Sequence, residues 1–332
     1  MKILITGGNG FIGSHVTRHF VKQGHEVCVA TRNTYAGKMK NIQDIVRHIT
    51  LLIGDLAEPD FARACASWPA EWVIHMAAET HVDKAIIDPL RFIRANVVGT
   101  ANVLHAYTAG QHAPPARMLL YSTDEVFGST PVGVQFDEQT PYNPSNAYSA
   151  SKVAVEAIAR SFVVTHDLPL IVVRPCNTYG PGQHPEKVIP KFVEQIRRGV
   201  PLTVYNDGRG TRDWLHVVDH ASAVETLLRS GRVGESYNLA AGEVHTDLEI
   251  AQAVIETLAP DEGTSTFVPG RLGHDARYVM DGTKLHRLGW QPDVDFREGV
   301  RETILWNAQH PEWWAHDLIQ GAALREPAYA TS

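Results

Sequence analysis

The sequence contains few cysteines and no long apolar run, and both deficits restrict the class of protein. Only three of its 332 residues are cysteine. Cys28, Cys65 and Cys176 lie far apart, which favours reduced thiols over a disulfide framework. No stretch reaches the length of a membrane-spanning helix, and the first residues lack the apolar core of a signal peptide. We therefore expect a cytoplasmic protein with no membrane partner.

Basic charge and metal-binding motifs are also scarce. The formal net charge is -7, which argues against a nucleic-acid partner because such proteins present a basic face. Although there are 17 histidines, neither an HExxH nor a Cys-x-x-Cys pattern is present. We expect no metal site, and any anionic ligand must be held by local groups.

Short apolar strands alternate with helical patterns through the first half of the chain. We predict strands at residues 2–6, 26–30, 49–53, 72–76, 117–122 and 170–174. Their continuous apolar runs are typical of parallel strands buried on both faces, so we expect an α/β fold with a Rossmann-type doubly wound parallel sheet.

The pattern loosens after about residue 175, where prolines punctuate the chain and isolated strands (residues 202–205 and 236–239) mix with helices. We expect residues 1–175 to form mainly a dinucleotide-binding domain. Residues 176–310 are expected to form mainly a smaller C-terminal α/β substrate lobe, with some of the chain crossing back. Residues 311–332 are the C-terminal tail, whose Trp313 and Trp314 could serve packing or contact.

A glycine-rich segment, residues 7–13, follows the first predicted strand and opens a helix predicted at residues 11–23. Glycines at such a turn let the backbone approach a pyrophosphate, and the free N–H groups of the helix start attract the anion. In this strand–turn–helix context the segment predicts a dinucleotide site.

The second strand lacks the acid that usually binds the adenosine ribose, and Thr31 and Arg32 stand there instead. Arg32 could neutralise a 2'-phosphate, which would favour NADP over NAD. Alternatively, it stacks on the adenine or points to solvent.

Proton donors and acceptors gather at two further places. Tyr148 and Lys152 are one helical turn apart on one face, where the ammonium would lower the pKa of the phenol and make it a base for oxidising an alcohol. Thr123, Asp124 and Glu125 follow the strand at residues 117–122. Two carboxylic acids beside an alcohol-oxidising pair suggest chemistry beyond one hydride transfer.

These residues resemble a known family. The glycine segment and the Tyr148/Lys152 pair are similar to the extended short-chain dehydrogenases/reductases. Residues 123–128, 177–183, 184–190 and 212–214 resemble more narrowly the nucleotide-diphosphate-glucose 4,6-dehydratases. The resemblance runs from residue 2 to about 307, and the Asp124-Glu125 pair is its most discriminating part.

The resemblance implies an NAD-dependent lyase that converts an NDP-glucose into the NDP-4-keto-6-deoxy sugar. Among the NDP-glucoses, it favours dTDP-glucose as the substrate. Tyr148 would take the proton of the C4 hydroxyl, and Thr123 would hydrogen-bond to the same oxygen. Glu125 would then remove the C5 proton, and Asp124 would protonate the departing C6 hydroxyl. The implied cofactor contacts are Gly7, Gly10, Phe11, Ile12, Gly13, Thr31, Arg32, Asp55, Leu56, Ala77, Tyr148 and Lys152. The implied substrate contacts are Glu79, His81, Asn177, Lys187, Arg212, Asn238 and Arg277.

Departures from the family pattern leave alternatives open. Phe127 replaces a tyrosine and Thr178 replaces a second asparagine, so dTDP, UDP, GDP and CDP sugars all remain candidates. An epimerase or decarboxylase of the same superfamily is the nearest rival, and a non-catalytic NAD(P)-binding sensor is a further one.

Two predicted helices, residues 89–109 and 148–165, bear on assembly. The second has two apolar stripes, and a helix apolar on two faces is usually buried on both. We expect a homodimer formed by these helices, unless the smaller lobe covers the second face.

Overall fold

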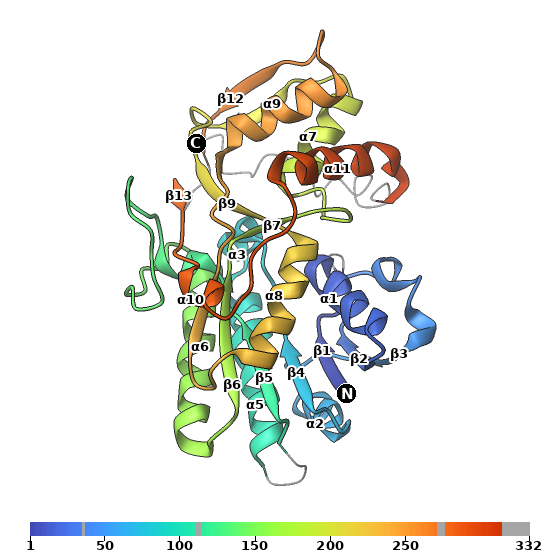
Figure 1. The fold of residues 1–332 in the computed structure, drawn as a ribbon, viewed down its shortest axis with the longest axis vertical. Coiled ribbons are helices and arrows are strands. Elements are labelled where there is room, and N and C mark those ends of the chain that lie inside the picture. Colours follow the sequence, from blue (N-terminus) through green and yellow to red (C-terminus); the bar gives the residue numbers. More distant parts are fainter. Residues whose placement is uncertain (35–36, 110–113, 271–275, 314–332) are drawn as a thin grey trace.

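A parallel sheet of seven strands forms the larger part of the molecule (Figure 1). The computed structural model describes residues 1–34, 37–109, 114–270 and 276–313. The strand order is β10-β6-β5-β4-β1-β2-β3, and every neighbouring pair is parallel. The strands are β1 (Lys2–Thr6), β2 (Glu26–Thr31), β3 (Ile49–Ile53), β4 (Trp72–His75), β5 (Arg117–Tyr121), β6 (Leu170–Pro175) and β10 (Ser236–Leu239). The expected Rossmann-type sheet is confirmed, and its predicted strands are correct to within one residue.

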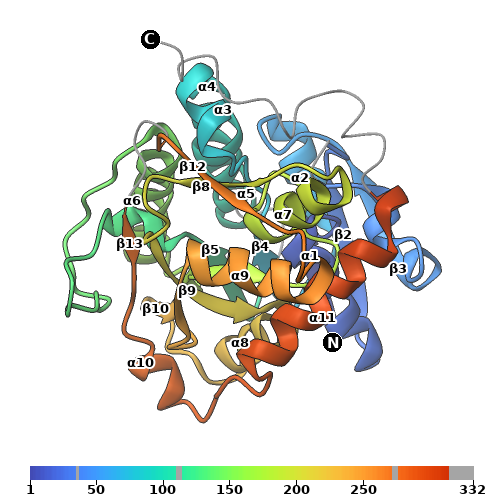
Figure 2. The same cartoon turned by 90° about the horizontal axis from the view of Figure 1, so that it is seen from above.

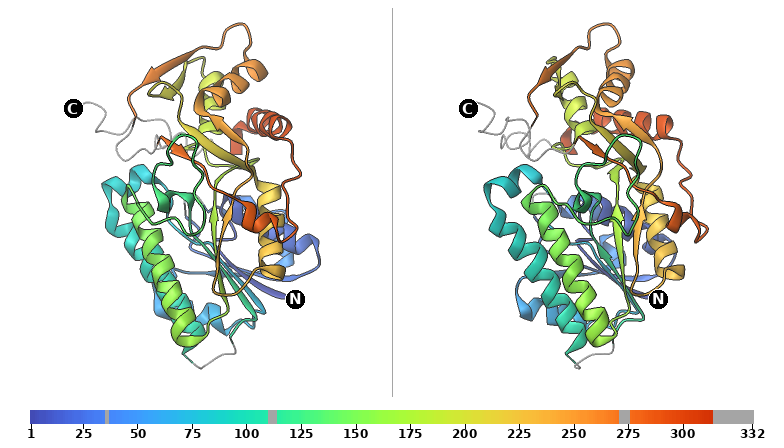
Figure 3. Two further views of the ribbon diagram at one scale, coloured as in Figure 1. Left: turned by 60° about the vertical axis from the view of Figure 1, so that its left-hand side comes forward. Right: turned by 90° about the vertical axis from the view of Figure 1, so that its left-hand side faces the viewer.

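Helices cover both faces of this sheet. On one face lie α2 (Pro59–Ser67), α5 (Gly99–Thr108) and α6 (Ala147–His166), and on the other lie α1 (Phe11–Lys22) and α8 (Val217–Ser230). Figure 3 shows α5 and α6 running side by side. Within β1, Ile3 and Ile5 belong to one apolar core while Leu4 belongs to the other, as a strand buried on both faces requires.

The helix predicted at residues 89–109 is interrupted. It consists of α4 (Pro89–Phe92), the π-helical turn η3 (Ile93–Val98) and α5, and it is preceded by α3 (Val82–Ile87). The turn places the buried Asn96 so that its amide donates to the carbonyl oxygen of Glu79 (3.0 Å) and to Ser151 Oγ (2.9 Å). Insertions of this kind are frequent at functional sites, and apolar periodicity gives no sign of them.

The smaller lobe lies over the carboxyl ends of the strands (Figure 2). Its sheet is formed by β7 (Asn177–Tyr179), β9 (Thr211–His216), β11 (Val244–Thr246) and β13 (Arg277–Tyr278), and β8 (Leu202–Tyr205) pairs with β12 (Ser265–Val268). Its helices α7 (Val188–Arg197), α9 (Asp247–Leu258) and α11 (Phe296–Gln309) share a separate apolar core. The chain returns from this lobe to the first sheet, where it forms α8, β10 and α10 (Thr283–His286).

Short helical turns complete the chain: η1 (Met39–Ile42), η2 (Val46–His48), η4 (Asp124–Phe127) and η5 (Pro311–Trp313). Trp313 in η5 serves packing, because its ring meets that of Trp306 edge-on at 5.2 Å and lies 4.5 Å from Lys40 Nζ. Trp314 and the rest of the predicted tail lie outside the described residues.

Three further features bear on the first expectations. Cys28, Cys65 and Cys176 are buried and free. In the described part of the chain, no helix is long and apolar enough to cross a membrane. Within the same residues, no group of three or more His, Cys, Asp or Glu side chains could hold a metal ion.

Candidate active site

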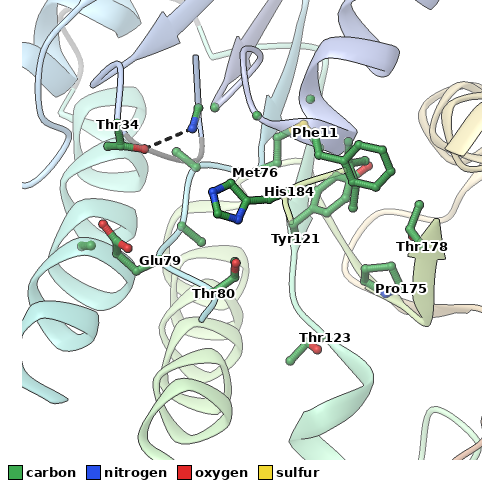
Figure 4. Close-up of a pocket in the computed structure, with 18 of the residues that line it drawn as sticks. Phe11, Thr34, Met76, Glu79, Thr80, Tyr121, Thr123, Pro175, Thr178 and His184 are labelled. Atoms are coloured by element: carbon green, nitrogen blue, oxygen red, sulfur yellow. Dashed lines mark hydrogen bonds between the residues drawn. The ribbon is translucent and has the colours of Figure 1, made fainter. Parts of the chain in front are cut away.

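A cavity of about 360 Å³ opens where the parallel strands end beneath the smaller lobe. This edge of a doubly wound sheet is where such folds bind ligands. Residues far apart in the sequence, among them Thr34, Glu79, Thr123 and His184, surround it (Figure 4). The predicted residues that line it are Gly7, Gly10, Phe11, Ile12, Gly13, Thr31, Arg32, Asp55, Leu56, Ala77, Glu79, Thr123, Asp124, Glu125, Tyr148, Lys152, Asn177 and Lys187.

The glycine segment forms one wall of the cavity. Gly7 has a φ of +72°, which side chains rarely adopt, and a Cβ added to Gly13 would stand 2.2 Å from the carbonyl oxygen of Gly7. Gly10 precedes α1, and no side chain caps this helix start. Its N–H groups are therefore available to an anion such as a pyrophosphate.

The end of β2 is arranged around hydrogen bonds in place of the missing acid. Thr31 Oγ1 donates to Asn9 Oδ1 (2.6 Å), and Asn9 Nδ2 donates to the carbonyl oxygen of Gly37 (2.8 Å). Arg32 pairs with Asp55 (3.1 Å) and Glu79 (2.5 Å). Its charge is therefore compensated by two carboxylates and is not simply directed to solvent.

Glu79 has a different environment from the one expected for a ligand of sugar hydroxyls. Its carboxylate is buried and also accepts from Arg91 Nη2 at 2.8 Å. His81, expected beside it, does not line the cavity but places Nε2 3.2 Å from Glu186 Oε2. Glu186 does line the cavity, and burial raises the pKa of its carboxyl group.

Tyr148 and Lys152 are both buried on the face of α6 that lines the cavity. Lys152 Nζ donates to the carbonyl oxygen of Tyr121 at 2.9 Å, and burial lowers the pKa of Lys152 to about 8. From the sequence we expect the ammonium to lower the pKa of the Tyr148 phenol. In the structure the opposite holds, because burial and the charge of Glu125 raise that pKa.

Thr123, Asp124 and Glu125 turn into the cavity at η4. Thr123 Oγ1 accepts from the Glu125 N–H (3.3 Å) and donates to Asp124 Oδ1 (3.0 Å). Burial and the neighbouring Glu125 charge raise the pKa of Asp124 to about 7, so its carboxyl group can stay protonated near neutrality. Asn146 Nδ2 lies 3.4 Å from Glu125 Oε2, on the side of α6. The two acids thus lie in different environments, which a pair with separate acid and base tasks requires.

The predicted nucleotide contacts are only partly brought together. Asn177 and Lys187 line the cavity, whereas Arg212, Asn238 and Arg277 do not. Arg212 is buried and donates to the carbonyl oxygen of Ala276 (3.2 Å). Its positive charge lowers the pKa of Asp124 and so opposes the effect of burial.

Asn238 and Arg277 make protein contacts instead. Asn238 is fully buried in β10, and its Nδ2 donates to the carbonyl oxygen of Phe136 (3.0 Å). In this arrangement its side chain is not open to the cavity, and its contact with substrate stays a prediction. Arg277 Nη1 donates to the carbonyl oxygens of Pro131 (2.9 Å) and Val134 (2.6 Å), which ties down the segment before α6.

Sequence reasoning missed several residues of the site. Asn9 and Asn96 fix the loops that carry the glycines and Glu79, and His184 and Glu186 line the cavity. A polar residue inside an apolar helix was the available signal for Asn96. Asn9, His184 and Glu186 lie within residues 7–13 and 184–190, which the motif and the resemblance singled out, but neither periodicity nor spacing distinguishes these wall residues from solvated loop residues.

Comparison with known proteins agrees with this geometry. The family model described as GDP-mannose 4,6 dehydratase matches residues 4–303. The dTDP-glucose 4,6-dehydratase of Neisseria gonorrhoeae is 42% identical, with 92% of this chain and 94% of that protein covered. The low-salt glycan biosynthesis protein Agl12 of Haloferax volcanii is 38% identical, with 92% and 97% covered.

Solved structures give the same picture. The dTDP-glucose 4,6-dehydratase DesIV of Streptomyces venezuelae, solved with NAD and dTDP bound, matches with a TM-score of 0.88 and 35% identity over 95% of this chain and 99% of that one. The UDP-glucose 4-epimerase of Thermus thermophilus, in complex with NAD, matches with a TM-score of 0.85 and 31% identity over 92% and 99%.

Proposed function

Because the chain belongs to the GDP-mannose 4,6 dehydratase family, we propose that it is an NAD-dependent lyase that converts dTDP-glucose into dTDP-4-keto-6-deoxyglucose. The observation that supports this most directly is the meeting of Thr123, Asp124, Glu125, Tyr148 and Lys152 at the wall of one cavity with the glycine segment. A hydride-transfer enzyme without elimination would need only part of this set.

The residues present fit a dinucleotide. The cradle at residues 7–13 leaves no room for a Cβ at Gly13, and the uncapped start of α1 suits a pyrophosphate. Arg32, Asp55, Leu56 and Ala77 line the same cavity and are the further candidates for cofactor contacts. Bound there, NAD would supply the hydride acceptor for oxidation at C4 and the hydride donor for reduction at C6. Because two carboxylates already neutralise Arg32, we propose NAD rather than NADP.

Tyr148 is the group that takes the proton from the C4 hydroxyl. Its burial disfavours the phenolate, so a positive charge beside it is required when the proton moves. Lys152, one helical turn away, supplies that charge. Thr123, whose hydroxyl favours the phenolate of Tyr148, can hydrogen-bond to the same substrate oxygen and so orient the C4 hydroxyl.

Glu125 and Asp124 divide the elimination between them. Oxidation at C4 makes the C5 proton acidic, and Glu125 removes it as a carboxylate. Asp124, protonated because burial raises its pKa to about 7, donates to the C6 hydroxyl as it leaves as water. The C5–C6 double bond forms as the C5–H and C6–O bonds break, so charge and atoms balance.

We assign cofactor binding mainly to residues 1–175 and nucleotide binding mainly to residues 176–310. Lys187 lines the cavity and is the candidate for the diphosphate, since a lysine ammonium is a common phosphate ligand. Asn177 lines the same wall. We therefore expect substitutions that alter selectivity for the nucleotide sugar to lie in residues 176–310.

Turnover of labelled substrate tests the function. The protein is incubated with dTDP-glucose deuterated at C4, and the product is examined by mass spectrometry and NMR. We expect the 4-keto-6-deoxy sugar with deuterium at C6 of the same molecule and no consumption of added cofactor. Deuterium lost to water, or the absence of product from every member of a panel of dTDP, UDP, GDP and CDP hexoses, would refute the proposal.

The same experiment separates the rival function. The similarity to a UDP-glucose 4-epimerase supports C4 oxidation equally well. An epimerase would return a hexose that keeps its C6 hydroxyl and has inverted C4. The paired acids of η4 favour the dehydratase, because inversion needs no group to expel the C6 oxygen.

We also propose a cytoplasmic homodimer. Buried free cysteines are what a reducing compartment maintains. Large apolar side chains are exposed on the outer helices: Ile87 and Leu90 at 74% and 76%, and Val164 on α6 at 65%. Such a surface suits a second copy of the chain. Leu90→Arg should yield monomers in analytical ultracentrifugation, and a wild-type protein that is monomeric at micromolar concentration would contradict this assembly.

A further inference from the structure

A buried ion pair lies directly behind the catalytic side chains. Glu156 belongs to α6 and Arg174 to β6, and their side chains are only 3% and 4% exposed. Arg174 Nη2 donates to Glu156 Oε2 at 2.6 Å and Nε to Oε1 at 2.9 Å. Because desolvation makes such pairs expensive, stability alone is a poor explanation for one.

The carboxylate of Glu156 also fixes the end of β5. Ser122 Oγ donates to its Oε1 at 2.5 Å, and the Ser122 N–H donates to the carbonyl oxygen of Val173 at 2.8 Å. Ser122 immediately precedes Thr123. A shift of Glu156 would therefore move Thr123, whose hydroxyl acts on the Tyr148 phenol and donates to Asp124.

Arg174 extends the same contact to the turn that holds the two acids. Its guanidinium lies 4.9 Å from the ring centre of Phe127, the last residue of η4, and Nη1 donates to the carbonyl oxygen of Glu138 (3.3 Å). Tyr142 OH donates to Glu156 Oε2 (2.9 Å). One buried pair thus contacts α6, β5, η4 and the segment before α6.

The charge of Glu156 acts on Lys152. The two residues are one helical turn apart on α6, and Glu156 opposes the burial that lowers the pKa of Lys152 to about 8. Nearby, His75 on β4 interacts with the Lys152 charge, Asp124 and Glu125 on η4 act on Tyr148, and Arg174 on β6 pairs with Glu156. Among these groups, Glu156 is the one whose charge raises the Lys152 pKa.

We propose that Glu156, clamped by Arg174, is a positioning residue for the hydride-transfer half of the reaction. It keeps the Lys152 ammonium charged and holds residues 122–123 against α6. Glu156 does not line the cavity, and it acts through Lys152 and Ser122. This inference rests on the proposed function, because it assigns Lys152 the task of supporting the Tyr148 proton transfer.

The test isolates the step in which Lys152 takes part. With dTDP-6-deoxyglucose no C6 hydroxyl is available to leave, so Asp124 is not needed and reduced nicotinamide accumulates and is read by absorbance. The pH dependence of its formation is compared for wild type and Glu156→Gln. We expect the loss of activity at alkaline pH to move by roughly one to two pH units to lower pH, which is the effect of removing a unit charge about 6–10 Å away at an effective dielectric of about 20. Glu156→Asp keeps the charge, so its pH profile should stay close to that of wild type.

Further variants keep the test decisive. Glu156→Gln leaves Arg174 buried without its partner, so Glu156→Gln with Arg174→Gln is used if the single variant does not fold. Both should show the alkaline shift. Ser122→Ala removes a hydrogen bond but no charge, so it should lower kcat without moving the profile. Glu194→Gln is the matched control, because Glu194 is a buried glutamate paired with Arg197 and Arg198 in α7.

The outcomes separate the two proposals. A folded Glu156 variant that loses activity equally at every pH would limit Glu156 to a structural role and overturn the inference, while wild-type turnover leaves the proposed function standing. A wild type that neither converts dTDP-glucose nor reduces its cofactor with the analogue would overturn the function and the inference with it.

Discussion

The two sides of the cavity are constructed differently. On the cofactor side, the glycine segment, Thr123 and Ala77 follow the ends of neighbouring parallel strands of one sheet. On the nucleotide side, the candidates that line the cavity are Asn177 in β7 and Lys187 in the loop before α7, which are separate elements of the smaller lobe. Strand ends of one sheet meet by geometry, whereas loops meet only through tertiary packing. The cofactor side should therefore contain the chemistry, and the nucleotide side the selectivity.

Replacing Glu125 should produce the largest effect and is the most direct test of this comparison. Glu125→Gln keeps the shape of the side chain but removes the base for the C5 proton, so kcat should fall by roughly 10²–10⁴-fold. NAD affinity, measured by calorimetry, should stay within a few-fold of wild type. Formation of reduced nicotinamide from dTDP-6-deoxyglucose should also persist. A variant that loses cofactor binding as well would make Glu125 a structural residue.

Asp124 gives a prediction about stability as well as activity. Its pKa is raised from 3.8 to about 7, so the unfolded state binds fewer protons than the folded state between these values, and stability falls as pH rises through that window. Asp124→Asn removes this penalty. It should be more stable than wild type by on the order of 4 kcal/mol at pH 8 and equal to it below the unfolded pKa of 3.8.

Denaturant unfolding at the two pH values measures this difference. The same substitution should lower dehydration, because the amide cannot donate the acidic proton, and wild-type dehydration should decline above about pH 7 for the same reason. Equal stability of both proteins at pH 8 would mean that Asp124 is ionised and solvated in the folded protein.

Lys187 and Asn238 sharpen the nucleotide side of the comparison. Lys187 lines the cavity while Asn238 is fully buried in β10. Lys187→Ala should raise KM about 10-fold, the loss of one charged contact, with kcat nearly unchanged. Asn238→Ala should instead lower the free energy of unfolding by about 1 kcal/mol, since it removes buried hydrogen bonds, and leave KM close to wild type. Steady-state kinetics give the KM of each variant, and denaturant unfolding gives its free energy of unfolding. If Asn238→Ala raised KM and left the free energy of unfolding unchanged, Asn238 would be a substrate contact.

The same division explains what could be predicted from the sequence. The apolar runs placed the central strands to within one residue, because burial on both faces leaves no other pattern. Thr123 to Glu125, Tyr148 and Lys152 were found because they follow a strand or share a helix face. The π-helical turn at residues 93–98, the engagement of Arg277 with Pro131 and Val134, and the burial of Asn238 depend on contacts between distant segments. Local pattern contains no information about such contacts.

Replacing Arg32 should have the smallest effect on cofactor affinity. This residue stands on the cofactor side, where the family pattern has an acid for the adenosine ribose. Asp55 and Glu79 already neutralise this arginine, so a 2'-phosphate would have to displace them. Wild type should therefore bind NAD more tightly than NADP, and Arg32→Ala should weaken both by a similar factor of a few-fold, through lost packing on the adenosine.

Titration calorimetry with the two cofactors measures both affinities, and Arg63→Ala, an exposed arginine paired with Asp60, serves as the control. A selective loss of NADP affinity in Arg32→Ala would make Arg32 a phosphate ligand. In that case the pairing with Asp55 and Glu79 must open when the cofactor binds. The cofactor side would then be less completely preformed than its strand ends suggest, and the contrast between the two sides would weaken at this one residue.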